Sequence, residues 1–154
     1  MKSKIHEFQS KNIFTMSKKL FLTFALTFIG VLSFAQIEGK WKTIDDETGK
    51  PKSIVEISKD SKGKYVGKIV QLLIKPENVN CVKCKDDRKN KPLIGLEIIR
   101  GLSKDGNEFS GGTITNPKDG KSYKTEIVRE GDELKVKAII LGIAVKTQTW
   151  HKVS

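Results

Sequence analysis

Short runs of alternating hydrophobic and polar residues fill the chain after residue 35, and no helical periodicity interrupts them. Runs rich in Val, Ile, Thr, Tyr and Trp are separated by clusters of Gly, Asp, Asn and Lys, whose residues suit tight turns. The pattern predicts eight strands, at Ile37–Asp45, Ser53–Lys59, Lys64–Ile74, Leu93–Leu102, Phe109–Thr115, Ser122–Arg129, Leu134–Leu141 and Ala144–Val153.

Eight strands with short connections predict an all-β, antiparallel meander. Closing such a sheet into a single up-and-down barrel removes its two edges, and the interior then holds side chains or one small ligand. A two-sheet sandwich is compatible with the same alternation, but the succession of short hairpins favours the barrel.

Strand phase assigns an inward face to each strand. In the seventh strand the inward set is Leu134, Val136, Ala138 and Ile140, and in the third strand it includes Ile69 and Gln71. Four aromatic side chains are also inward by phase, namely Trp41, Tyr65, Phe109 and Tyr123. Core packing alone would explain these aromatics, whereas a cavity lined by them would form an apolar ligand pocket with a few polar groups.

Glu97 is a further candidate for that pocket. It lies in a largely apolar run, and if Arg100 faces outward its carboxylate faces inward, where it needs a cation or a hydrogen-bond donor. A local bulge that turns Glu97 outward is the alternative.

The N-terminal 35 residues follow a different pattern. Lys18-Lys19 precede an uncharged, apolar run of 15 residues, Leu20–Phe34, which ends in the small-residue motif Ser33-x-Ala35. We expect a secretory signal peptide cleaved after Ala35, because the run is shorter than the roughly 20 residues of a spanning helix. Met16 already opens a short basic region, so residues 1–15 are expected to be a mis-annotated extension.

Cleavage would leave residues 36–154 as one barrel domain, exported to the periplasm or the medium and without stable membrane insertion. This part of the chain holds a single histidine, His151, and no nucleophile motif, so we expect neither an enzyme nor a metal or other cofactor. The whole chain has a formal net charge of +11, but the lysines are spread over the strands, and no nucleic-acid-binding motif accompanies them. We therefore expect no nucleic-acid partner.

Cys81-Val-Lys-Cys84 lies in the long connection between residues 75 and 92. Outside the cytoplasm, such a pair favours a structural disulfide that braces the loop. A thiol-exchange site is an alternative, although that motif usually opens a helix, and a closed zinc site would need about four ligands.

The first strand carries Gly39-Lys40-Trp41 and the last ends in Trp150-His151-Lys152, which resembles the lipocalin/calycin barrels. That resemblance implies that Trp41 plugs the closed end and that a cation from the final strand, here Lys152 where arginine is expected, packs over it. A longer set of motifs, from Gly39 to Ile57, Gly63 to Val70, Cys81 to Cys84 and Gly111 to Tyr123, resembles the secreted bacterial domain of unknown function 2147 family. This resemblance covers about residues 37–153 and implies export and a lipocalin-like barrel, with no activity attached.

Two functions follow from this picture. The first is a binder whose small apolar or amphipathic ligand occupies the barrel and enters at an end rimmed by the Cys81–Cys84 loop. The second is a non-enzymatic envelope module with a filled core, which contacts an unknown protein partner through its basic loop at Lys83, Lys85 and Arg88. The presence or absence of a cavity in the barrel distinguishes these two functions.

Overall fold

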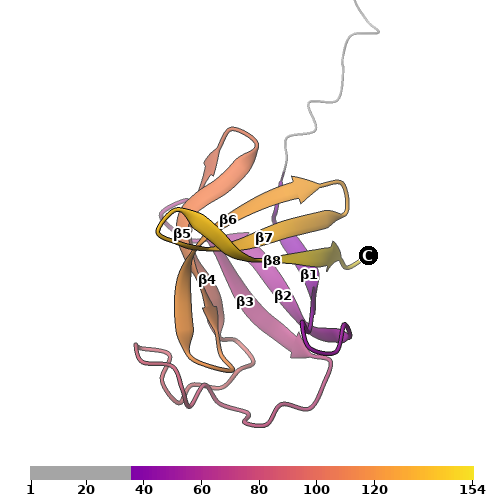
Figure 1. Cartoon of the computed structure of the whole chain (residues 1–154), viewed down its shortest axis with the longest axis vertical. Helices are drawn as coiled ribbons and strands as arrows, with labels where there is room; N and C mark the ends of the chain where they lie inside the picture. The colour runs from indigo at the N-terminus through magenta and orange to yellow at the C-terminus, as the bar shows by residue number, and fades with distance from the viewer. Residues whose placement is uncertain (1–35) are drawn as a thin grey trace, which may run out of the picture. The chain divides into compact units, whose positions relative to one another are not determined.

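The computed structural model describes residues 36–154, which form a closed antiparallel β-barrel (Figure 1). Its eight strands follow one another around the barrel in chain order: β1 Gly39–Ile44, β2 Pro51–Lys59, β3 Tyr65–Leu72, β4 Glu97–Asp105, β5 Glu108–Asn116, β6 Lys121–Glu130, β7 Glu133–Ile140 and β8 Ile143–Lys152. The last strand closes on the first where Trp41 lies opposite Lys152 and Lys42 opposite His151. The predicted up-and-down barrel is confirmed, and the sandwich is excluded.

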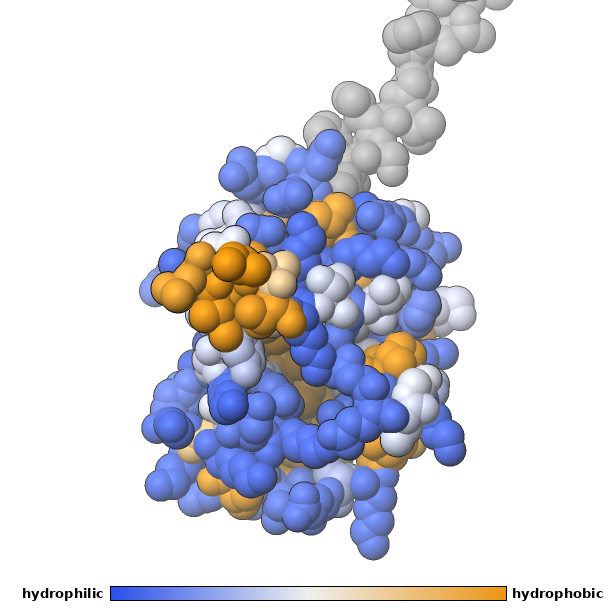
Figure 2. Space-filling view, viewed as in Figure 1, coloured by the Kyte–Doolittle hydropathy of each residue, from blue (hydrophilic) through white to orange (hydrophobic). Residues whose placement is uncertain are grey.

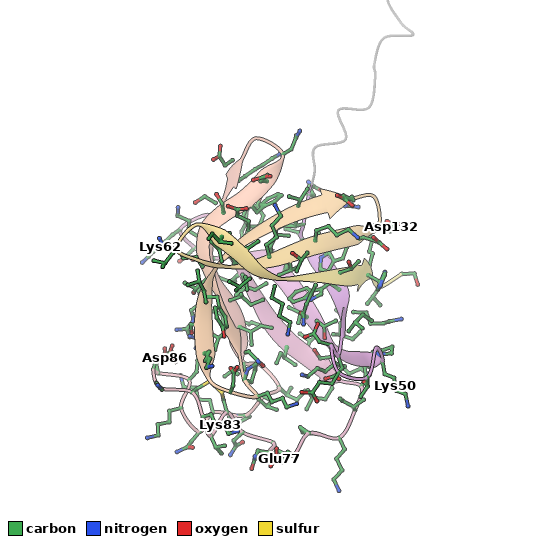
Figure 3. The ribbon with its side chains drawn as sticks, in the orientation of Figure 1. Lys50, Lys62, Glu77, Lys83, Asp86 and Asp132 are labelled. Atoms are coloured by element: carbon green, nitrogen blue, oxygen red, sulfur yellow. A yellow bond between two sulfur atoms is a disulfide. The ribbon has the colours of Figure 1, made fainter. Side chains whose placement is uncertain are left out.

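Because successive strands run in opposite directions, their connections divide between two ends of the barrel. The turns β2–β3, β4–β5 and β6–β7 lie at the end where the chain enters β1, which we call the closed end. The connections β1–β2, β3–β4, β5–β6 and β7–β8 belong to the other end, the open end. Figure 3 shows this division, with Glu77 and Lys83 of the β3–β4 loop far from Asp132 in the β6–β7 turn.

The half of the barrel next to the closed end is filled with side chains. Its nearly fully buried members are Trp41, Ile57, Tyr65, Leu102, Phe109, Ile127 and Leu134. Tyr65 and Phe109 pack edge to face, with ring centroids 4.9 Å apart. Burying each of these large side chains contributes about 2 kcal/mol, which makes this half the main source of hydrophobic stabilisation.

Trp41 closes this half, and the cation over it is not the expected one. The Trp41 Nε1–H donates to the Ile37 carbonyl at 2.7 Å, and the Arg129 guanidinium carbon lies 5.6 Å from the ring centroid. Lys152 instead faces Asp132, with Nζ and Oδ1 4.0 Å apart. The expectation for Lys152 was wrong because Arg129, which shares the inward phase of Ile127 on β6, reaches over the barrel end.

Two predicted core positions, Gln71 and Ile140, are exposed. In the β2–β3 ladder, Ile54 pairs with Gln71 and Val55 with Ile69, so one residue of β3 is extra and Gln71 turns outward. In the β7–β8 ladder the extra residue is Val145 of β8, so the alternation of β7 is not interrupted. Ile140 is exposed as the last residue of β7, next to the hairpin turn. The inward assignment of Gln71 was wrong because it assumed uninterrupted alternation, and that of Ile140 because it assumed that the strand stays in the barrel to its end.

The fourth strand begins later than the sequence predicts. It starts at Glu97 rather than Leu93, and residues 73–96 form one long loop at the open end. Leu93 and Leu96 nevertheless remain buried, and the Leu96 carbonyl accepts a hydrogen bond from Ile69 N at 3.0 Å. The apolar run therefore marks a loop that packs on the barrel, not additional strand.

Candidate ligand cavity

The half of the barrel next to the open end contains a cavity of about 660 Å³. Its inner wall is largely apolar and includes Ile69, Leu72, Ile98, Ile114, Val136, Ala138 and Trp150. Most of these residues lie towards the open ends of β3, β4, β5 and β7, whereas Trp150 comes from the part of β8 that pairs with Leu134 of the packed half. The face drawn in Figure 2 is hollowed, with hydrophobic atoms at the bottom of the recess. The interior is therefore divided into a packed half and a hollow half.

A few polar groups interrupt the apolar wall. Thr43 Oγ1 and Ser53 Oγ lie 2.8 Å apart across β1 and β2. The Trp150 Nε1–H donates to Gln148 Oε1 at 3.1 Å, so the indole nitrogen is satisfied inside the cavity. Tyr123 also lines the cavity, and no hydrogen bond involves its hydroxyl within the described residues. These groups could orient the polar end of a bound molecule.

Ion pairs span the mouth of the cavity. Lys118 Nζ of the β5–β6 turn lies 2.6 Å from Glu47 Oε1 of the β1–β2 turn, and this contact raises the pKa of Lys118. Lys146 of β8 pairs with Asp46 of the same turn. All four side chains line the cavity, so charged groups at the mouth surround an apolar interior.

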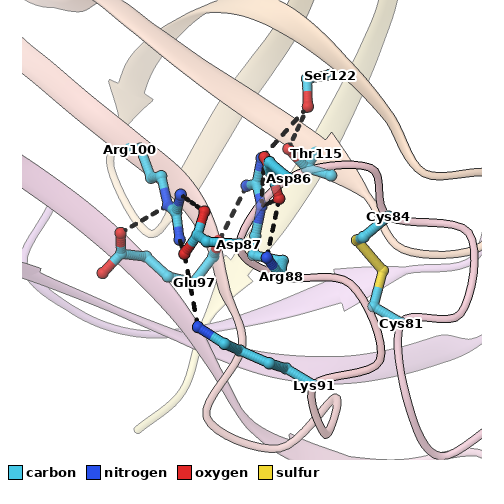
Figure 4. Close-up of polar contacts among 10 residues, drawn as sticks. All are labelled: Cys81, Cys84, Asp86, Asp87, Arg88, Lys91, Glu97, Arg100, Thr115 and Ser122. Carbon is cyan, nitrogen blue, oxygen red and sulfur yellow. Dashed lines mark hydrogen bonds and ion pairs between the residues drawn. A yellow bond between two sulfur atoms is a disulfide. The ribbon is translucent and has the colours of Figure 1, made fainter.

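The β3–β4 loop covers part of the open end and is braced by a disulfide between Cys81 and Cys84 (Figure 4). Both cysteines are buried, which confirms the expected structural bridge. The loop packs tightly on the β5–β6 turn, where Gly120 has φ +71°. A Cβ on Gly120 would lie 1.9 Å from the Lys83 carbonyl oxygen, so only glycine permits this approach.

Arg88 fixes the same loop to the barrel wall. Its guanidinium is almost completely buried, its Nε donates to Asp86 Oδ1 at 3.0 Å, and its Nη1 donates to the Glu97 carbonyl at 3.1 Å. Nη2 also reaches Ser122 Oγ on β6, at 3.4 Å. Hydrogen bonds from Arg88 lower the pKa of Asp86 to about 2. A buried cation paired in this way holds the loop in one position.

Glu97 lies outside the cavity, on the outer face of β4. It pairs with the exposed Lys68 in the β3–β4 ladder, and its Oε1 lies 2.9 Å from Arg100 Nε. Arg100 also donates to both carboxylate oxygens of Asp87, at 2.7 and 2.9 Å, which lowers the pKa of that carboxyl (Figure 4). The inward assignment of Glu97 was wrong, because a shift in the ladder near Ile98 turns it outward.

The structure also places the other four predicted site residues in two different parts of the barrel. Trp41, Tyr65 and Phe109 belong to the packed half and do not line the cavity, whereas Tyr123 does. The sequence analysis missed the hydroxyls of Thr43, Ser53 and Thr115 and the burial of Arg88. Threonine and serine occur on both faces of strands, so the sequence does not show which of them face the interior. Arg88 lies in a loop, where the alternation of a strand cannot predict burial.

His151 does not contribute to the cavity. It lies on β8 with Nδ1 3.4 Å from Glu133 Oε1, and neither residue lines the pocket. Within residues 36–154, no group of three His, Cys, Asp or Glu side chains is placed to hold a metal ion. The same part of the chain has no helix with the length and apolarity to cross a bilayer.

A closed eight-stranded barrel with one packed end and one hollow end defines a lipocalin-like protein. The chain belongs to the family described as "Uncharacterized protein conserved in bacteria (DUF2147)", whose model matches residues 39–152. The fold is similar to the solved structure of protein HP1028 from Helicobacter pylori, which is described as a protein that "belongs to the lipocalin family". The TM-score is 0.66 and the sequence identity is 21%, and the match covers 77% of this chain and 84% of that chain. At this identity the likeness shows the fold. The comparison with curated proteins gives no match.

Proposed function

We propose that this protein is an exported, non-enzymatic binder that holds a small apolar or amphipathic molecule in its barrel. The observation that carries the proposal is the cavity of about 660 Å³ at the open end. Ligand pockets in proteins usually measure about 300–1,000 Å³ and combine an apolar wall with a few polar groups. A filled-core interaction module would lack this cavity, so the binder is the better supported of the two functions.

The distribution of polarity indicates how a ligand would lie. Ile69, Ile98 and Val136 form part of an apolar wall suited to a hydrocarbon or aromatic body. The charged pairs Lys118–Glu47 and Lys146–Asp46 stand at the mouth, where a polar end could remain in contact with water. An amphipathic molecule with its apolar part inward fits this arrangement.

Export is part of the same proposal. The Cys81–Cys84 disulfide supports it, because disulfides persist chiefly in oxidising compartments such as the periplasm or the medium. The expected signal peptide lies in residues 1–35, outside the described residues. Edman sequencing of the protein recovered from the periplasm or medium tests cleavage, and a mature chain that begins at Gln36 is the expected result.

Titration with a fluorescent apolar probe, N-phenyl-1-naphthylamine, tests ligand binding. We expect saturable uptake, which Ala138→Trp abolishes because the indole occupies the cavity. Tyr123→Glu should weaken uptake, since an apolar ligand would desolvate the new carboxylate. Thr147→Trp is the matched control, because Thr147 is exposed on β8 and does not line the cavity.

Two outcomes would contradict the proposal. One is failure of the probe and of dispersed lipids to bind at all. The other is equal uptake by the wild type and by Ala138→Trp, which would place the probe elsewhere on the protein.

A further inference from the structure

The tip of the β7–β8 hairpin carries a concentrated group of exposed hydrophobic side chains. Its members are Ile140, Leu141, Ile143 and Val145, and Leu141 is 96% exposed. Figure 2 shows them as a continuous hydrophobic cluster on an otherwise largely hydrophilic face. Within residues 36–154, the other exposed large hydrophobic residues all lie in residues 73–94, the remaining part of the open end. The hairpin tip gathers four such side chains within six residues of the chain, and exposed apolar clusters of this kind usually mark contact surfaces.

The turn at this tip does not require an apolar residue. Leu141 has φ +51° and Gly142 has φ +81°, so both central residues are left-handed. Hairpin turns of this type favour Asn-Gly or Asp-Gly, because a bulky side chain is disfavoured at positive φ. A leucine that is both fully exposed and conformationally unfavourable gains nothing from the barrel itself. A contact outside the chain would give this apolar side chain a role.

Three lysines border the same hairpin. A groove of about 740 Å³ is lined by Ile139, Ile140 and Leu141, by three lysines, Lys85, Lys121 and Lys124, and by Asp86, whose charge is paired with the buried Arg88. In the part of the chain that the structure describes, none of these three ammonium groups forms an ion pair. The surface therefore combines an apolar projection with adjacent positive charge.

We propose that this hairpin docks the barrel reversibly on an anionic phospholipid surface. The side chains at the tip would enter the boundary between headgroups and acyl chains, and the three lysines would contact lipid phosphates. Charge complementarity favours this occupant over a second copy of the chain. A symmetric dimer through the same surface would bring like-charged lysines together.

Docking would also place the cavity mouth near the lipid. Val145 of the hairpin lines the cavity and is itself exposed, so the mouth and the proposed membrane contact are continuous. The proposal goes beyond ligand binding and does not depend on it, because vesicle binding can be measured without any ligand in the cavity.

Flotation of residues 36–154 with lipid vesicles tests the proposal, since the closed barrel and its core lie within these residues. We expect binding to phosphatidylcholine vesicles that contain phosphatidylglycerol, much weaker binding to pure phosphatidylcholine, and a decrease as salt rises. Leu141→Asn should reduce binding about tenfold, as should Lys121→Gln combined with Lys124→Gln. Asparagine tolerates positive φ, so Leu141→Asn keeps the turn.

Matched controls separate this surface from general effects. Val79→Asn removes an exposed apolar side chain from the β3–β4 loop, and Lys40→Gln with Lys50→Gln removes two exposed charges, one from β1 and one from the β1–β2 turn. Both controls should bind vesicles as the wild type does. Absence of vesicle binding, or equal losses in the controls, would overturn the proposal. So would a dimer in size-exclusion chromatography that Leu141→Asn converts to a monomer, because a second copy would then cover the tip.

Discussion

The Arg129 guanidinium lies over the Trp41 indole, 5.6 Å from the ring centroid, and covers the closed end of the barrel. The same side chain donates from Nε to the Gly131 carbonyl at 2.8 Å and from Nη1 to the Gln36 carbonyl. One residue of β6 thus joins the plug of the barrel, the adjacent turn and the segment that leads into β1.

Replacing this arginine should lower the stability of the barrel. We expect Arg129→Met to reduce the free energy of unfolding by about 2 kcal/mol, through loss of the cation–π contact and of hydrogen bonds to two carbonyls. Lys152→Met, the control at the other candidate cation, should cost less than about 0.5 kcal/mol, because within residues 36–154 the Lys152 side chain forms only an exposed ion pair. Urea unfolding measures both. Equal losses in the two variants would show that Arg129 is not the stabilising cation.

Gly120 should tolerate no side chain. Gly120→Ala places a Cβ against the Lys83 carbonyl and should destabilise the protein by about 3 kcal/mol or more, since backbone of the disulfide loop must move. Gly63→Ala is a matched control, because Gly63 has a similar φ of +74° but no atom within 4 Å of the added Cβ. It should cost about 1 kcal/mol from backbone strain alone. Thermal or urea unfolding of the pair isolates the contribution of the loop contact.

The disulfide should contribute modestly to stability. Cys81 and Cys84 are separated by three positions, and in the chain-entropy account a ring of this size stabilises by about 2 kcal/mol. We therefore expect the double variant Cys81→Ala and Cys84→Ala to keep the barrel, as judged by far-ultraviolet circular dichroism, and to lose about that free energy of unfolding. Unfolding of the variant at room temperature would instead show that the bridge is needed for the fold.

The Asp86–Arg88 contact should make stability depend on pH. Arg88 lowers the pKa of Asp86 from 3.8 to about 2 in the folded chain, so the carboxylate stabilises the fold fully above the unfolded value. That contribution is lost as pH falls through the folded value. Asp86→Asn lacks it at every pH, so the wild type should be more stable at neutral pH and the two should converge near pH 2.

Urea unfolding at a series of pH values measures this convergence. Asp105→Asn, at an exposed position of β4, serves as the control for a general effect of removing a negative charge. A difference between the wild type and Asp86→Asn that stays constant down to pH 2 would contradict the assignment.

Strand identity was predictable, but strand phase was only partly so. The alternation of Leu134, Val136 and Ala138 with lysines gives β7 directly, and all three are fully or partly shielded in the barrel. The positions of Gln71 and Glu97 were wrong for one shared reason. Each lies beside a bulge in its own strand, and a bulge depends on the neighbouring strand rather than on the local sequence. Ile140 was wrong for another reason, because it ends β7 at the exposed hairpin tip.

The sequence predicted the kind of site, an apolar pocket inside the barrel, but not the residues that line it. Inward phase correctly placed Trp41, Tyr65 and Phe109 in the core, yet it could not distinguish the packed half from the hollow half. Of the aromatic candidates, Tyr123 alone lines the cavity. Which half is hollow depends on how side chains from all eight strands fill the interior, and that is a property of the assembled barrel.

The sequence by itself determined the eight-strand pattern, which predicted the barrel, and it favoured the disulfide, because alternation, turn residues and cysteine spacing are local features. Only the tertiary structure decided where the cavity lies, which cation covers Trp41, and that the apolar residues at the β7–β8 tip remain exposed. Those outcomes depend on contacts between residues distant in the chain, such as Arg129 with Trp41 and Lys83 with Gly120. Packing and register set such contacts, and neither is encoded in any single strand.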